Sequence, residues 1–139
     1  MRRINDFSEI LNERKSVKVF DSDYKIPHEE MDEIITKATK APSSVNMQPW
    51  RIVVVDSDEG KAKLKDAFGF NSRQLTTSSA MIIIFGDLQN YEKAEQIYSD
   101  AVDQQHMTEE IKTQMLEWIL PYYKGLSKEG MKDIVNIDS

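Results

Sequence analysis

The residues from Ala41 to Trp50 hold the side chains best suited to chemistry in this 139-residue chain. The segment reads APSSVNMQPW and runs directly into an apolar stretch at 52–55. Its serine hydroxyls, together with the amide groups of Asn46 and Gln48, offer donors and acceptors on short side chains. Such a set matches the alternating C=O and N–H groups at the edge of a heteroaromatic ring. The alternative is a turn that ends one helix and starts one strand.

A second cluster, at residues 14–20, reads RKSVKVF and places three cations and a hydroxyl within five residues. Alternation along an extended segment would put Ser16 and Lys18 on one face, with Val17 and Val19 on the other. Cations that converge with a hydroxyl suit a phosphate, which accepts charge-assisted hydrogen bonds. The alternative is a solvated basic strand edge.

Together the two clusters resemble the FMN-dependent nitroreductase family. The resemblance rests on three matches in order: ERKSVKVF at 13–20, the segment 41–50, and Phe70-Asn71 ahead of Ser78-Ser79 and a strand. It extends over residues 7–90, whereas residues 91–139 match only in helical character. The resemblance implies an α+β fold, in which a nitroreductase-like central sheet is flanked by helices.

The resemblance also implies a bound FMN and the residues that hold it. The basic cluster would bind the phosphate and ribityl chain, and Lys18 would also reach the ring edge. The polar segment would reach the flavin across a dimer interface, while Asn71 would hydrogen-bond the pyrimidine edge and Gln74 would add a polar contact. The predicted cofactor-binding residues are Arg14, Lys15, Ser16, Lys18, Pro42, Ser43, Ser44, Asn46, Asn71 and Gln74. No catalytic acid or base and no metal ligand is nominated.

By resemblance, the chain is predicted to be an FMN-dependent oxidoreductase, a flavoprotein that uses NAD(P)H to reduce nitroaromatics, quinones or similar acceptors. The flavin carries the redox chemistry, and the protein supplies orientation and hydrogen bonds. Family members are longer and continue into a central helix, a loop beside the flavin N5 and a late basic segment. Residues 1–139 are therefore predicted to form a single domain that lacks the family's C-terminal part, with weak FMN binding and low turnover.

Two alternatives to an active oxidoreductase stay open at this point. One is a truncated flavin-binding or interaction protein of the same fold, without turnover. The other is an unliganded fragment that keeps only the dimer surface. A yellow purified protein separates the first from the second, and bleaching by NAD(P)H separates an enzyme from both.

Composition restricts the other classes of function. A net charge of −6 argues against nonspecific binding to nucleic acid or to an anionic membrane surface. No apolar segment reaches membrane-spanning length, and the charged N-terminus lacks the apolar stretch of a signal peptide. Cysteine is absent, which excludes disulfides and thiolate metal sites. The cytoplasm is the default location, and apolar helices over a small sheet predict a homodimer.

Helices and strands in alternating order must position these residues. Strands are predicted at 52–55 and 81–85, with a third possible at 17–20. Helices are predicted from apolar residues at helical spacing in six places: 7–11 with Asp6 as N-cap, 31–38, 58–68 with Gly69 as C-cap, 91–102, 111–119 stopped by Pro121, and 131–135. Asn136–Ser139 is interpreted as the start of a further helix.

Several other side chains are predicted to have structural roles only. The methionines and Trp118 fall at helical spacing and are predicted to pack in the core. His28 and Asp32 are separated by one helical turn, but His28 is predicted to precede the helix, so a metal between them is disfavoured.

Overall fold

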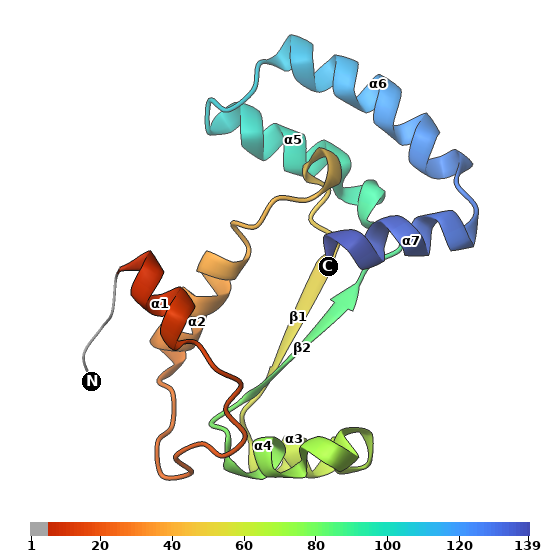
Figure 1. Cartoon of the computed structure of the whole chain (residues 1–139). Helices are drawn as coiled ribbons and strands as arrows, with labels where there is room; N and C mark the ends of the chain where they lie inside the picture. Colours follow the sequence, from red (N-terminus) through yellow and green to blue (C-terminus); the bar gives the residue numbers. More distant parts are fainter. Residues whose placement is uncertain (1–5) are drawn as a thin grey trace. The chain divides into compact units, whose positions relative to one another are not determined.

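The computed structural model describes residues 6–139. They form seven α-helices, three 3-10 helices and two strands (Figure 1). In chain order these are α1 (Phe7–Glu13), α2 (His28–Ala38), η1 (Ser44–Asn46), β1 (Trp50–Val55), α3 (Asp58–Lys63), η2 (Lys65–Asn71), α4 (Ser72–Thr77), β2 (Met81–Gly86), η3 (Asn90–Lys93), α5 (Ala94–Asp103), α6 (Glu109–Gly125) and α7 (Lys128–Asp138). The N-terminal stretch used in the signal-peptide argument lies mostly outside the described residues.

Strands β1 and β2 pair antiparallel and are the two strands that the sequence predicts (Figure 1). The prediction of a possible third strand at 17–20 is wrong, because that segment is irregular and its side chains are exposed. Its backbone pairs with a side chain instead of a strand: the Phe20 N–H donates to Thr77 Oγ1 at 3.0 Å. Val17 and Val19 remain 45% and 58% exposed, so no apolar face drives pairing.

The described residues form two compact units. Unit 1 comprises the residues up to Ile26 together with Val54–Met81, and unit 2 comprises Pro27–Val53 and Ile82–Ser139. The prediction of a single domain stays a prediction.

Unit 1 contains α1, α3, η2 and α4. Helix α1 begins as predicted, since Asp6 Oδ1 accepts a hydrogen bond from the Glu9 N–H at 2.9 Å. The single helix predicted at 58–68 is wrong: α3 ends at Lys63, the chain continues as η2, and α4 follows. Glycine disfavours an α-helix interior, and Gly69 lies in η2 without the positive φ of a C-cap.

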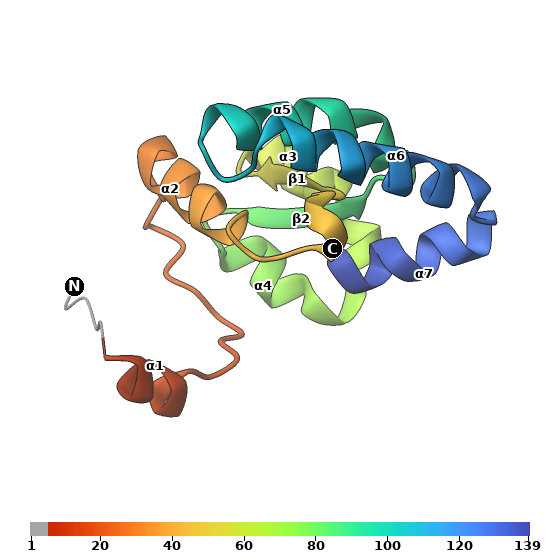
Figure 2. The same cartoon turned by 90° about the horizontal axis from the view of Figure 1, so that it is seen from above.

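Unit 2 contains α2 and the helices from α5 onward, and its core joins α5, α6 and α7. Helices α5 and α6 lie side by side in both views (Figures 1 and 2). The buried core residues are Met47, Ala94, Tyr98, Ile119, Tyr123, Met131 and Val135. Within the described part of the chain, no helix is both long and apolar enough to cross a membrane.

Four expectations for unit 2 are wrong. Helix α6 continues through Pro121, because this proline is exposed and water can satisfy the carbonyl that loses its N–H partner. Trp118 is 61% exposed rather than buried. The residues at 136–138 end α7 instead of starting a new helix, since Ser127 caps α7 through a 3.1 Å bond to the Gly130 N–H. His28 is the first residue of α2 and does not precede it.

Candidate functional site

The basic segment, residues 14–20, is a cationic surface in unit 1. All its side chains are exposed, and within residues 6–139 no ion pair engages Arg14, Lys15 or Lys18. The last residue of the segment is anchored by Thr77, whose Oγ1 accepts from the Phe20 N–H at 3.0 Å, and the chain that follows is anchored by Ser79, whose Oγ accepts from the Ile26 N–H at 2.7 Å. Cations that lack a carboxylate partner leave their charge available to an anion such as a phosphate.

Asn71 and Gln74 form an exposed amide pair in the same unit. Gln74 Nε2 donates to Asn71 Oδ1 at 3.2 Å, across the start of α4. Asn71 precedes α4 but makes no capping hydrogen bond with its side chain. The pair therefore keeps the Asn71 NH₂ as a donor and the Gln74 oxygen as an acceptor for another molecule. A donor beside an acceptor is complementary to a pyrimidine edge.

The polar loop, residues 43–48, lies in unit 2 and has an unusual backbone. Val45, Asn46 and Gln48 have φ values of 47°, 58° and 48°. Positive φ is unfavourable for any residue with a Cβ, and most of all for β-branched valine. Two bonds inside the loop stabilise this shape: the Gln48 N–H donates to Ser43 Oγ at 2.9 Å, and Gln48 Nε2 donates to Asn46 Oδ1 at 3.2 Å.

Groups outside the polar loop hold its later half. The Tyr98 hydroxyl donates to the Val45 carbonyl at 2.8 Å, and Arg51 Nη1 donates to the Gln48 carbonyl at 3.0 Å. Arg51 is itself paired with Asp87 at 2.5 Å. Burial, followed by the neighbouring Tyr123, raises the pKa of Tyr98 to about 12, so the hydroxyl stays a neutral donor. Because the protein's own hydrogen bonds fix its backbone, the polar loop is preorganised for binding.

Asp138 holds the beginning of the polar loop from the end of α7. The Ser44 N–H donates to Asp138 Oδ2 at 2.9 Å, and the Ser44 hydroxyl donates to Oδ1 at 3.1 Å. Pro42, just before the loop, is exposed.

The predicted cofactor residues thus divide between the units. Unit 1 holds Arg14, Lys15, Ser16, Lys18, Asn71 and Gln74, whereas unit 2 holds Pro42, Ser43, Ser44 and Asn46. Sequence reasoning missed the supports Thr77, Tyr98 and Asp138. No pattern singled out Thr77, Tyr98 was recognised only as a residue at helical spacing in the helix predicted at 91–102, and Asp138 was interpreted only as a helix cap.

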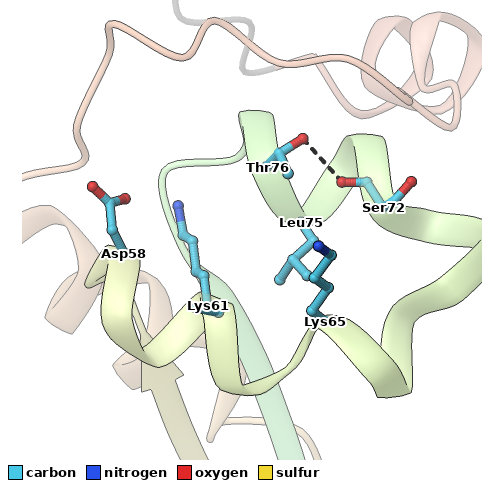
Figure 3. A pocket seen from close by; sticks show the side chains of 7 residues that line it. Asp58, Lys61, Lys65, Ser72, Leu75 and Thr76 are labelled. Carbon is cyan, nitrogen blue, oxygen red and sulfur yellow. Dashed lines mark hydrogen bonds between the residues drawn. The ribbon is translucent and has the colours of Figure 1, made fainter.

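A pocket of about 320 Å³ lies between α3 and α4, in unit 1 (Figure 3). Its walls are made by Asp58, Lys61, Ala62, Lys65, Ser72, Leu75 and Thr76. Lys61 is only 6% exposed, rises from α3 between Asp58 and α4, and donates from Nζ to the Ser78 carbonyl. None of the predicted cofactor residues lines this pocket. The described residues contain no group of three or more His, Asp or Glu side chains placed to hold a metal ion.

Unit 2 thus holds a preorganised polar loop, and unit 1 holds a cationic segment whose side chains make no ion pair within residues 6–139. Comparison with known proteins identifies the family. The chain belongs to the nitroreductase family, whose model matches residues 11–110. This confirms the family and the fold predicted from the sequence.

Individual relatives resemble the chain over nearly its whole length. It is 44% identical over 138 residues to YdgI of Bacillus subtilis, provisionally named an NAD(P)H nitroreductase. A solved Staphylococcus epidermidis protein, provisionally named an NAD(P)H:FMN oxidoreductase, is 82% identical, with a TM-score of 0.96 over 100% of this chain. A solved Exiguobacterium sibiricum protein, provisionally named a nitroreductase and in complex with FMN, is 42% identical, with a TM-score of 0.94 over 99% of this chain.

The chain spans about two thirds of the length of these relatives: 66% of the Bacillus protein and 65% of each solved chain. The predicted cofactor, FMN, is confirmed as a ligand of this family by the Exiguobacterium complex.

Proposed function

We propose that this chain binds FMN and acts as an NAD(P)H-dependent flavin oxidoreductase toward nitroaromatics, quinones or similar acceptors. One observation carries the proposal: unit 1 combines a cationic segment that makes no ion pair within residues 6–139 with the hydrogen-bonded amide pair of Asn71 and Gln74. A phosphate is recognised by the first and a pyrimidine edge by the second. The FMN complex of the Exiguobacterium relative supports the same ligand.

Each set of residues has a distinct task in this proposal. Arg14, Lys15 and Lys18, with the Ser16 hydroxyl, bind the phosphate and ribityl chain. Asn71 and Gln74 orient the pyrimidine edge of the ring. When bound, FMN supplies the redox chemistry by accepting a hydride from NAD(P)H and passing electrons to the acceptor. No side chain is assigned to move a proton.

The polar loop serves the flavin of a second copy, so the proposed enzyme is a homodimer. Exposed apolar side chains on unit 2 support self-association: Trp118 and Tyr122 are 61% and 50% exposed, and their rings stack at 6.3 Å. Sedimentation at tens of micromolar should give a dimer, and a monomer at that concentration contradicts this part of the proposal. The proposal also places the protein in the cytoplasm, because the nicotinamide donor is supplied there.

The test begins with the purified full chain, its bound FMN measured by absorbance. Oxidation of NADH and of NADPH is then followed with a nitroaromatic and with a quinone. Flavin binding with turnover on either acceptor supports the proposal. Flavin binding without turnover favours the alternative, a flavin-binding protein of this fold. Absence of FMN binding contradicts both.

A matched pair of double variants tests the residue assignment. Arg14→Ala with Lys18→Ala removes two cations from the basic segment, and Lys124→Ala with Lys132→Ala removes two exposed cations from α6 and α7. The first should weaken FMN binding at least ten-fold, since hydrogen bonds to charged groups contribute about 1.5–3 kcal/mol each. The second should bind FMN like the wild type. Equal losses in both would show that net charge alone, not this segment, attracts the flavin.

A further inference from the structure

We propose that Asp138, at the end of α7, is a positioning residue that holds the polar loop in its flavin-binding shape; its functional part rests on the proposed FMN binding. Both carboxylate oxygens accept hydrogen bonds from Ser44, one from the backbone N–H at 2.9 Å and one from the hydroxyl at 3.1 Å. The two residues lie 94 positions apart in the sequence and belong to unit 2. Two bonds to one carboxylate fix the direction of Ser44 as well as its position.

The position of the Asp138 carboxylate at the end of α7 is electrostatically unfavourable for that helix. The C-terminal end of a helix carries partial negative charge, and the last turn of α7 contains no basic residue to offset it. Ser44 begins the 3-10 turn η1, and the preceding residue, Ser43, makes no capping hydrogen bond with its side chain. The first N–H groups of a helical turn need an acceptor. Asp138 supplies that acceptor from a distant element.

Packing brings Asp138 to the loop independently of the hydrogen bonds. Met131 and Val135, 6% and 2% exposed, bury one face of α7 in the core of unit 2. At the end of β2, a Cβ on Gly86 would lie 2.2 Å from Val135 Cγ1 and 3.2 Å from Ser139 Oγ. Only glycine permits this approach. This packing therefore fixes the end of α7, and with it the position of the Asp138 carboxylate.

The polar loop requires such a support because its backbone is unfavourable. Val45 and Asn46 follow Ser44 directly and both have positive φ. Residues held in this region persist only where the surroundings over-determine them. Tyr98 and Arg51 hold the later half of the loop, and the contact with Asp138 holds its beginning.

The first experiment needs no flavin. Amide hydrogen exchange is measured by NMR in Asp138→Ala and in Asp133→Ala, which removes an exposed carboxylate from the same helix. Loss of the acceptor should make the Ser44 amide exchange about ten-fold faster in Asp138→Ala, with smaller increases at Asn46 and Met47. Asp133→Ala should match the wild type. Equal exchange at Ser44 in the two variants overturns the proposal.

The second experiment measures FMN affinity in the same variants and in Ser44→Ala. Asp138→Ala should weaken FMN binding about ten-fold, whereas Asp133→Ala should leave it unchanged. In the Ser44→Ala background, removing Asp138 should have a smaller effect, because the two residues act through one contact. Full additivity overturns the positioning role. If the wild type binds no FMN, the proposed function fails, and the exchange result alone decides whether Asp138 holds the loop.

Discussion

The basic segment and the polar loop are built in opposite ways. The basic segment is exposed throughout, its last residue donates a hydrogen bond to Thr77, and the chain that follows donates one to Ser79. The polar loop buries Met47 completely and receives hydrogen bonds from Tyr98 and Arg51. Attraction between charges acts over several ångströms and tolerates movement, whereas hydrogen bonds to a ring edge require fixed directions. In the proposed FMN-binding role, the basic segment can therefore remain loose, whereas the polar loop must be rigid.

The sharpest contrast between the two regions is in their contribution to stability. Met47→Ala should lower the free energy of unfolding by about 2–5 kcal/mol, because it removes a fully buried side chain from the core of unit 2. Val19→Ala, in the basic segment, should change it by less than about 0.5 kcal/mol, since Val19 is exposed. Urea unfolding measures both values. Similar losses of unfolding free energy in the two variants would contradict the proposed difference between the polar loop and the basic segment.

The second largest effect concerns flavin affinity and falls on the basic segment. Lys18→Glu should weaken FMN binding by about ten- to a hundred-fold, corresponding to a charge-assisted contact of about 1.5–3 kcal/mol. The loss should shrink in high salt, which screens exposed charges, and the unfolding midpoint should stay unchanged. Calorimetric titration at two salt concentrations measures this. Lys132→Glu is the control, and equal affinity of Lys18→Glu and wild type would refute the assignment.

A smaller effect tests the rigidity of the polar loop. Tyr98→Phe removes the hydroxyl that donates to the Val45 carbonyl and should cost about 1 kcal/mol of unfolding free energy. The pKa of Tyr98 is raised from 10.0 to about 12, so the native state holds this proton more tightly than the unfolded state. The contribution of Tyr98 to stability should therefore stay constant below pH 10 and be lost between pH 10 and 12.

The pH profile of Tyr98→Phe provides the check. Part of the alkaline decline should disappear in this variant. Burial, followed by Asp138 and Tyr122, also raises the pKa of Tyr123, so a second part of the decline should remain. An alkaline profile identical to that of the wild type would show that the hydroxyl of Tyr98 does not couple loop shape to folding.

The smallest expected effect concerns the amide pair. Asn71→Ala should weaken FMN binding by a few-fold, up to about ten-fold, or shift the flavin reduction potential, since a neutral hydrogen bond contributes about 0.5–1.5 kcal/mol. Folding should be unaffected, because the side chain is exposed and caps no helix. Asn136→Ala, at an exposed position of α7, is the matched control. If flavin titration and potentiometry of Asn71→Ala overlay the wild type, Asn71 is a connecting residue only.

The sequence predicts the elements whose signals are local. Continuous apolar runs marked β1 and β2, and Asp6 marked the start of α1. The helix predicted at 58–68 failed because its apolar spacing continues past Lys63, whereas the chain leaves the α-helix there and continues as η2, without a proline or glycine at that point to mark the change. Pro121 failed as a stop because the proline is exposed, which the sequence does not state, so water can satisfy the carbonyl that loses its N–H partner.

The candidate site shows the same division. Residue types identified the basic segment, the amide pair and the polar loop, because charge and hydrogen-bonding capacity belong to single side chains. The supports could not be found in this way. The contact between Ser44 and Asp138 joins residues 94 positions apart, and the left-handed φ of Val45 contradicts the preference of valine. Long-range contacts of this kind become visible only when the chain is folded.

The placement of the two tryptophans also makes the polar loop optically observable. Trp50 follows the loop directly at the start of β1 and is half-buried, whereas Trp118 is 61% exposed on α6. In a Trp118→Phe variant, all indole fluorescence comes from a residue next to the loop. Emission wavelength then reports on the packing of the loop, and quenching by added flavin reports on its occupancy. One cuvette measurement can thus follow both properties without any attached dye.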